Sequence, residues 1–317
     1  MALRLPDHWL WDHWIADDGE RYHLFFLRAS RALHDPQRRH MNASMGHAVS
    51  DDARSWELVP DALVAREGPA FDDRAVWTGS TVVRPDGSLR VFYTGISRAE
   101  AGMVQRIGWA DCADGVTFER ATSEPLVADG RWYQKWAPGC GYDEAWRDPF
   151  VFLHDDGRWH MLITARAKGA DVKHAGVVGH AVSDDLDHWE VAPPLTGPSV
   201  FGHLEVSQSR TVQGHHLLVF SCGQDMQAEP GPGGVWVAEG GGPLGPWDVD
   251  RARYVRPEHL YAGQLLRLRD GEWVFTGFTD TVDGVFVGCA PDPIPWREVR
   301  LVERDRGAAP RPASRRA

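Results

Sequence analysis

The chain has 317 residues, 43% of them hydrophobic, and a formal net charge of −11 at pH 7. This length is enough for one large all-β domain or for two smaller domains. The negative charge excludes a basic footprint for a nucleic acid backbone or an anionic membrane surface. We therefore predict no nucleic acid partner and no membrane partner, and we expect a neutral small molecule such as a sugar.

The first residues, MALRLPDHWLWDHW, have no cationic segment followed by an apolar run, as a secretory signal would. No later stretch is long and apolar enough to cross a bilayer, so we expect a cytoplasmic protein. Because a chain of this size does not need disulfides and its cysteines lack metal-ligand spacing, we expect free thiols. These cysteines are Cys112, Cys140, Cys222 and Cys289.

A turn motif recurs along the chain. Residues 46–57 read GHAVSDDARSWE, residues 108–119 read GWADCADGVTFE, and residues 179–190 read GHAVSDDLDHWE. Looser copies end at Trp247 and Trp296. Each copy runs from a glycine-led strand through an Asp-rich turn to an aromatic residue that opens the next strand. Five copies of this kind predict five structural repeats.

Two further strand-like segments precede every copy of the motif. A run of aromatic and β-branched residues, such as RYHLFF or RWHMLIT, lies directly upstream, and a segment such as WLWDHWIA or RDPFVF comes before it. Each repeat would then hold four antiparallel strands, which is the blade of a β-propeller. The predicted blades cover residues 9–60, 71–127, 145–196, 203–254 and 260–303.

We therefore predict an all-β fold in which residues 1–303 form one five-bladed propeller domain. An open β-sandwich is the alternative, whereas an α/β fold finds no sustained helical periodicity to support it. Residues 304–317 combine Arg, Ala and Pro without periodicity, so we predict a disordered basic tail there.

Three acids stand on segments that we expect to line the channel of the propeller. Asp12 lies in LWDHW, Asp148 in WRDPF and Glu205 in HLEVSQ, and their neighbours are aromatic or apolar. An acid near a strand start is often only a turn residue, as we expect for the Asp-rich loops at 51–52 and 184–185. Convergent carboxyl groups in apolar surroundings indicate a functional site, because an unpaired buried charge is costly. Glycoside hydrolysis uses such a pair.

These segments resemble the fructan-acting clan of five-bladed propellers, glycoside hydrolase families 32 and 68. Trp11-Asp12-His13-Trp14 resembles the W-D-x-W element of family 68, and Trp77-Thr78-Gly79-Ser80 resembles its W-S-G-S element. Arg147-Asp148-Pro149 matches the R-D-P triplet of the clan. Glu205 occupies the place of the general acid/base, although its flanking residues are not a close copy. Tyr261-Ala262-Gly263-Gln264 is similar to a Y-A-x-Q element of family 32.

The chain also departs from both families. The W-M-N-D-P-N element of family 32 is absent, and there is no room for the C-terminal β-sandwich of that family. The chain is shorter than a typical family 68 enzyme. The resemblance therefore indicates a compact and divergent relative, with no C-terminal β-sandwich.

The resemblance implies a retaining hydrolase that cleaves β-fructofuranosyl linkages in sucrose or short fructo-oligosaccharides. Asp12 would be the nucleophile, Asp148 the stabiliser of the transition state, and Glu205 the general acid/base. These roles require a raised pKa at Glu205 and an ionised Asp12, while Arg147 would keep Asp148 anionic. No metal and no cofactor is required, and the 15 histidines show no tight cluster in the sequence.

The residues expected to contact sugar surround these acids, because indole rings and hydroxyl-binding groups suit a furanose ring. The predicted substrate-binding residues are Trp11, Trp14, Trp77, Thr78, Arg147, His203 and Gln264. Core packing is the alternative for the tryptophans, and we favour it for Trp56, Trp189 and Trp247 at the repeat position. For His13 and His203, contact with substrate and support from behind the acids both stay open.

Three other functions stay open. A family 43 type of arabinofuranosidase or xylosidase also uses three carboxyl groups on a five-bladed propeller, but it would invert configuration. A fructosyltransferase shares the covalent intermediate, so sequence does not separate transfer from hydrolysis. A sugar-binding propeller without activity is the third alternative, since one fold serves many functions. The sequence leaves the oligomeric state unknown.

Overall fold

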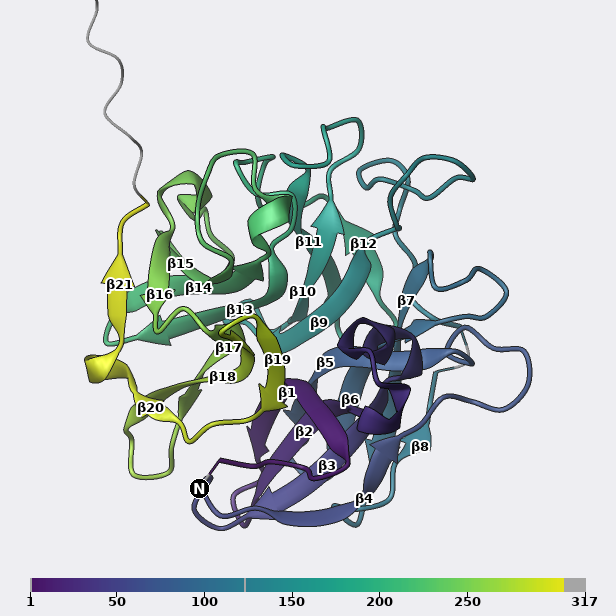
Figure 1. Cartoon of the computed structure of the whole chain (residues 1–317), viewed down its shortest axis with the longest axis vertical. Helices are drawn as coiled ribbons and strands as arrows, with labels where there is room; N and C mark the ends of the chain where they lie inside the picture. The colour runs from purple at the N-terminus through teal and green to yellow at the C-terminus, as the bar shows by residue number, and fades with distance from the viewer. Residues whose placement is uncertain (1, 123, 305–317) are drawn as a thin grey trace, which may run out of the picture.

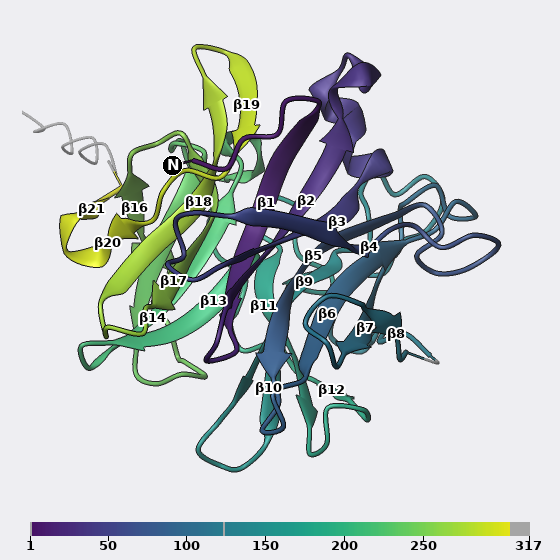
Figure 2. The ribbon, with the colours of Figure 1, turned by 90° about the horizontal axis from the view of Figure 1, so that it is seen from below.

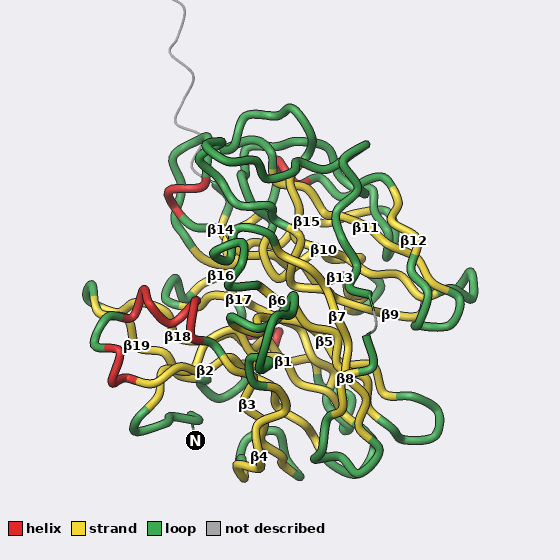
Figure 3. Tube along the Cα trace, turned by 90° about the vertical axis from the view of Figure 1, so that its right-hand side faces the viewer, coloured by secondary structure: helices red, strands yellow, loops and turns green. Residues whose placement is uncertain are grey.

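The computed structural model describes residues 2–122 and 124–304. Its strands form five antiparallel sheets, arranged radially around a centre as the blades of a propeller (Figure 1). Helix occurs as short 3₁₀ segments between strands, which Figure 3 shows in red. Among the described residues, no helix has the length and apolar character needed to cross a bilayer. The predicted all-β five-bladed propeller is confirmed.

In blades one to four the strands pair one after another, starting from the first strand. Blades one and two consist of β1 (His8–Asp17), β2 (Tyr22–Ser30), β3 (Ser44–Ser50), β4 (Glu57–Leu63), β5 (Ala75–Val83), β6 (Leu89–Ile96), β7 (Gln105–Cys112) and β8 (Glu119–Arg120). Blade three consists of β9 (Trp146–Leu153), β10 (Trp159–Arg166), β11 (Gly176–Ser183) and β12 (Glu190–Ala192). The 3₁₀ segments η1 (Arg31–Leu33) and η2 (Pro36–Asn42) form an insertion between β2 and β3.

The last two blades share the C-terminal part of the chain. Blade four holds β13 (Glu205–Val212), β14 (His215–Cys222), β15 (Gly234–Gly240), β16 (Arg253–Arg256) and β21 (Arg300–Val302). Blade five holds β17 (Leu260–Arg267), β18 (Trp273–Val282), β19 (Val285–Cys289) and β20 (Ile294–Pro295), and both β19 and β20 pair with β18. The remaining 3₁₀ segments are η3 (Gln224–Met226), η4 (Val249–Arg251) and η5 (Trp296–Glu298).

The end of the chain differs from the prediction. Residues 300–302, which we assigned to blade five, pair with β16 and add a fifth strand to blade four. Arg304, the first residue of the predicted tail, is buried, with its guanidinium 4.5 Å from the ring centre of Phe201 and 4.8 Å from that of Trp236. This cation–π contact holds Arg304 in the core, against the compositional prediction of a tail. Residues 305–317, the rest of that tail, lie outside the described residues.

The recurring motif forms the turns that it predicts. In blade one, Asp52 Oδ1 accepts hydrogen bonds from the backbone N–H groups of Arg54 and Ser55, at 2.8 and 2.7 Å. In blade three, Asp185 makes the equivalent bonds. The aromatic residues that follow, Trp56, Trp189 and Trp247, pack into the apolar clusters, which confirms core packing for them. All four cysteines are unpaired, as predicted.

Every first strand is irregular near its beginning. Pairing with the second strand shifts register at these points, as β-bulges do. Four residues at the bulges have positive φ angles: Asp12 (29°), Asp148 (56°), Val206 (51°) and Ala262 (50°). In blade two the bulge falls between Trp77 and Gly79. Backbone strain of this kind collects where a structure fixes functional groups.

The bulge in blade two yields a prediction about stability. A Cβ atom at Gly79 would stand 1.8 Å from the carbonyl oxygen of Phe92, which belongs to the backbone of β6. Because backbone cannot move aside, Gly79→Ala should lower the free energy of unfolding by about 2–4 kcal/mol in urea titrations followed by tryptophan fluorescence. The control is Gly197→Ala, where nothing lies within 4 Å of the added Cβ. Equal stability of both variants would contradict the prediction.

Candidate active site

A pocket of about 380 Å³ opens where the first strands begin. All five blades contribute to its walls, and the insertion η1–η2 and the β18–β19 hairpin project on the same side of the molecule (Figure 2). The lining residues are Trp11, Asp12, Leu27, Arg39, His40, Trp77, Thr78, Asp143, Arg147, Asp148, Glu205, Val206, Gly223, Tyr261, Phe278 and Asp280. The three predicted acids therefore meet in one pocket, although up to 193 residues separate them in sequence.

Asp12 stands at the bulge of β1 and faces blade two. The hydroxyl of Thr78 donates a hydrogen bond of 2.6 Å to Asp12 Oδ2. Burial and the neighbouring charge of Asp148 raise the pKa of Asp12 to about 7, although the bond from Thr78 works in the opposite direction. The structure thus places a carboxyl group of reduced acidity where we predicted an ionised nucleophile.

Asp148 lies at the bulge of β9, between blades three and four. Its Oδ2 atom accepts hydrogen bonds from the Thr164 hydroxyl at 2.8 Å and from the Val206 backbone N–H at 3.3 Å. Burial raises the pKa of Asp148 to about 6, although Arg147, whose Nε lies 3.6 Å from the same oxygen, lowers it. Arg147 is a charge partner as predicted, but its effect does not outweigh burial.

Glu205 is the most acidic of the three carboxyl groups. Its Oε1 accepts a hydrogen bond from Arg147 Nη2 at 2.5 Å, and its Oε2 accepts one from the Tyr261 hydroxyl at 2.5 Å. Burial raises its pKa, but the charge of Arg147 and the bonds from His203 and Tyr261 outweigh burial and hold the pKa well below its usual value. The predicted raised pKa of Glu205 is therefore wrong, because a guanidinium contacts this carboxylate directly.

A buried cluster of charged groups holds Arg147 in place. Asp143 Oδ2 lies 3.4 Å from Arg147 Nη1, and Asp143 Oδ1 accepts a hydrogen bond of 2.7 Å from Arg166 Nη2. Gln105 Oε1 accepts a further bond from Arg147 at 3.1 Å. The sequence analysis identified Arg147 but missed Asp143, Gln105 and Arg166. Asp143 precedes β9 in an irregular loop, and Gln105 and Arg166 belong to no recognised motif.

The wall of the pocket also holds residues that the sequence prediction missed. Arg39 and His40 come from η2, and Asp280 comes from β18. The Trp77 indole donates a hydrogen bond of 2.6 Å to the carbonyl oxygen of His40, which ties the insertion to blade two. Tyr261 belongs to the quoted Y-A-x-Q element, which was the available signal for it.

Three predicted substrate-binding residues do not line the pocket. Trp14 is buried, stacks on Phe25 and donates its indole N–H to Thr81, so it packs between blades one and two. Gln264 is buried on β17 and lies further along the strand than Tyr261. His203 lies behind Glu205, with 3.4 Å between its Nδ1 atom and Glu205 Oε1, so it supports the acid from outside the pocket.

The remaining predicted residues, Trp11, Trp77, Thr78 and Arg147, do line the pocket. His13, which was left open, is buried and bonds to Thr276 instead, at 2.6 Å. One grouping contradicts the expectation that the histidines are scattered. His154, Asp156 and His160 come together on blade three, outside this pocket.

The raised pKa of Asp12 makes its charge a cost to folding. Ionisation is resisted between the usual carboxyl value of 3.8 and about 7, so the wild-type protein should lose stability as pH rises through this window. Asp12→Asn removes this cost and keeps an oxygen that accepts from Thr78. We expect the variant to be more stable by about 1–3 kcal/mol at pH 8, and equal near pH 4, in denaturant titrations. A variant that is less stable than the wild type at pH 8 would contradict the unfavourable charge assigned to Asp12.

Comparisons with known proteins agree with this geometry. Residues 12–228 match the family model described as the glycosyl hydrolases family 32 N-terminal domain. An acid beta-fructofuranosidase of Vigna radiata var. radiata is 33% identical over 154 residues, which are 47% of this chain and 21% of that protein. A sucrose:sucrose 1-fructosyltransferase of Festuca arundinacea is 29% identical over 180 residues, which are 55% of this chain and 25% of that protein.

The chain thus matches only about a fifth to a quarter of the length of these curated relatives. Among solved structures, the inulosucrase from Halalkalicoccus jeotgali bound to kestose has a TM-score of 0.73 at 23% identity, with 96% of this chain and 90% of that chain covered. This likeness shows the propeller fold. Because the family model covers more than half of the sequence, the chain belongs to glycosyl hydrolase family 32.

Proposed function

We propose that the protein hydrolyses β-fructofuranosyl linkages in sucrose or short fructo-oligosaccharides with retention of configuration. The observation that carries the proposal is the meeting of Asp12, Asp148 and Glu205 in one pocket of a family 32 chain. Retaining hydrolysis uses one carboxylate as nucleophile and a second carboxyl group as proton donor. The third acid is then free to bind the hydroxyl groups of the sugar.

Asp12 is the proposed nucleophile, because its carboxyl group is fixed by one short bond from Thr78 and lines the pocket from blade one. Its attack on the anomeric carbon forms a fructosyl ester as the glycosidic bond breaks. Glu205, on blade four, gives its proton to the leaving oxygen and later takes a proton from water, which cleaves the ester. Asp148 accepts hydroxyl contacts that strengthen in the transition state.

Before this reaction, the proton held by the three acids has to move to Glu205. Asp12 and Asp148 have raised pKa values, whereas Arg147 favours an ionised Glu205. The productive state has the opposite arrangement, with the proton on Glu205. We infer that substrate hydroxyl groups compete for Arg147 and Asp148 and so make protonation of Glu205 less costly.

The size of the pocket favours a short substrate. A volume of about 380 Å³ lies near the lower end of the range for small-molecule sites. Arg39 and Asp280 line the pocket and offer charged groups to hydroxyls of the leaving sugar. Rapid hydrolysis of high-molecular-weight levan, with little action on sucrose or short oligomers, would contradict this part of the proposal.

Fructosyl transfer is the second candidate, favoured by the similarity to the Festuca arundinacea fructosyltransferase. Transfer and hydrolysis share the ester intermediate and differ in whether a sugar or water resolves it. At high sucrose concentration, products longer than the substrate would identify transfer, and free fructose in equal amount to glucose would identify hydrolysis.

The first test is incubation with sucrose, 1-kestose, levan-derived oligomers and aryl arabinofuranosides, with chromatography of the released sugars. We expect free fructose, with kcat reduced roughly 10³-fold or more in Asp12→Asn and about 10²–10⁴-fold in Glu205→Gln. The control is Glu190→Gln, an exposed acid on β12. Release of arabinose alone would indicate the family 43 type of activity, and binding without any product would indicate a sugar-binding propeller.

The distribution of the proton among the three acids predicts how catalysis depends on pH. Above about pH 7 the cluster gives up the proton held by Asp12, so no donor is left and kcat/KM should fall. Tyr261→Phe removes a donor to the ionised Glu205 and so favours the protonated form of that acid, but it should leave the high-pH limb in place, because Asp12 sets that limb. A profile that stays flat to pH 9 would contradict the assignment of the shared proton.

A further inference from the structure

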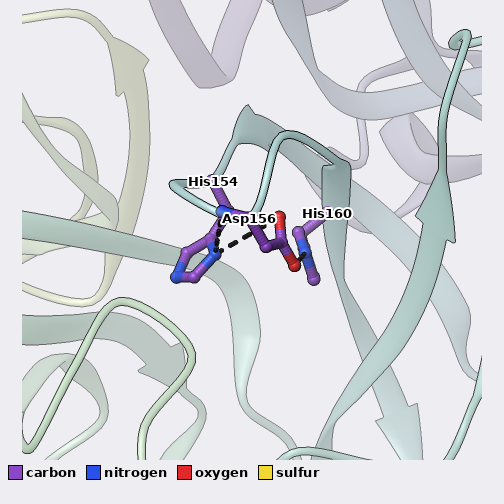
Figure 4. A group of neighbouring side chains, drawn as sticks. All are labelled: His154, Asp156 and His160. Carbon is purple, nitrogen blue, oxygen red and sulfur yellow. Dashed lines mark hydrogen bonds and ion pairs between the residues drawn. The ribbon is translucent and has the colours of Figure 1, made fainter.

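Two histidines and an aspartate meet at the hairpin between β9 and β10 (Figure 4). His154 Nδ1 lies 3.4 Å from Asp156 Oδ1, and His160 Nε2 lies 3.0 Å from Asp156 Oδ2. All three candidate ligand atoms lie within 4.8 Å of one another. His154 follows the last residue of β9, Asp156 lies in the turn, and His160 is the second residue of β10.

We propose that His154, Asp156 and His160 form a binding site for a divalent transition metal ion of the zinc type. Two imidazole nitrogens and one carboxylate oxygen are ligands that zinc accepts, at about 2.0–2.2 Å each. Ligands at this distance around a tetrahedral ion stand roughly 3.3–3.5 Å apart. The two histidines contact different oxygens of Asp156, at 3.4 and 3.0 Å, and the three candidate ligand atoms lie within 4.8 Å of one another, so the side chains would have to draw closer around a shared ion. The fourth position would remain for water.

Metal ligation needs a lone pair on one nitrogen of each imidazole. The Asp156 backbone N–H donates a long hydrogen bond of 3.3 Å to His154 Nδ1, which places the lone pair of this nitrogen on the side of Asp156. A metal ion would replace this weak bond. His160 Nε2 lies 3.0 Å from Asp156 Oδ2, and because a carboxylate only accepts, this nitrogen carries the proton of that hydrogen bond. Ligation would require His160 to carry its proton on Nδ1 instead, where Nε2 of the buried His180 lies 2.9 Å away and can accept it.

Blade one provides an internal comparison for this arrangement. Asp18, His23 and His47 form the same chain of hydrogen bonds, at 2.9 and 3.0 Å, as Asp156, His160 and His180 do in blade three. The turn sequences also match, DDGERYH against DDGRWH, but Ala16 stands where blade three has His154. The Asp–His–His chain is therefore a feature of the repeat, and the third ligand is specific to blade three.

The location of the site indicates a structural role. Asp148 and His154 are six residues apart on one extended strand, so the cluster lies roughly 20 Å from the catalytic pocket. An ion held there would link the end of β9 to the beginning of β10 and fasten the hairpin of blade three. The side chains of His154 and Asp156 are 22% and 43% exposed, so an ion can enter from solvent.

Isothermal titration calorimetry of the tag-free full chain with zinc chloride tests the site. We expect one saturable site per chain, with affinity weakened at least tenfold in His154→Ala and unchanged in His188→Ala. His188 is a matched control because it is an exposed histidine of the same blade that contacts only Asp185 among the acids. Zinc at about 100 times its Kd should also raise Tm by about 3–5 °C in the wild type and in His188→Ala, but not in His154→Ala.

Equal Tm values of His154→Ala and the wild type without metal would show that the variant is folded, so that a lost response to zinc reports on the site. The proposal is overturned by equal zinc affinity in His154→Ala and the wild type, by equal weakening in both variants, or by no saturable binding up to about 1 mM zinc. These readouts do not depend on any activity toward sugars. Failure of the metal site would therefore leave the proposed hydrolase function untouched.

Discussion

The active pocket depends on the positive charge of Arg147. Of the three carboxyl groups at the beginning of the first strands, that of Asp148 is buried and those of Asp12 and Glu205 are partly buried, and desolvation alone would favour their neutral forms. Arg147 contacts two of them, Asp148 and Glu205, and is itself held by Asp143. Because Asp12 receives no such contact from the arginine, it retains the highest pKa of the three acids. The direct hydrogen bond from Arg147 thus distinguishes Glu205, whose pKa is lowered, from Asp12 and Asp148, whose pKa values are raised.

The β-bulges provide the geometry that this charge distribution requires. A regular strand would send successive side chains to opposite faces of its blade. The bulges at Asp12 and Asp148 break this alternation, at positive φ, so that both carboxyl groups line the pocket. Val206, the residue directly after Glu205, also has a positive φ, and so does Ala262, the residue directly after Tyr261. Strain at these positions is compensated by the hydrogen-bonded blades on either side.

Features that recur from blade to blade could be predicted from the sequence, whereas features that occur only once could not. Five turn motifs predict five blades, and acids on first strands predict the pocket, because position within a repeat determines direction toward the channel. Asp143, Arg39 and Asp280 lie in loops or hairpin ends whose course no periodicity describes. Trp14 shares a motif with Asp12 yet packs in the core, since the bulge lies between Trp11 and His13 and only residues on one side of it face the pocket.

Comparison of equivalent positions across the blades distinguishes residues that the fold requires from residues that serve the chemistry of the site. At the bulges, blades one and three carry Asp12 and Asp148, blade four carries Val206 and blade five carries Ala262, all at positive φ. Blade two carries Thr78 at its bulge, without a positive φ. A requirement of the fold would act alike on the four positions that share this backbone geometry, so the change from Val or Ala to Asp points to function. The same comparison at the opposite ends of the first strands singles out His154. Repetition of a blade therefore supplies, within one chain, the internal reference against which functional residues stand out.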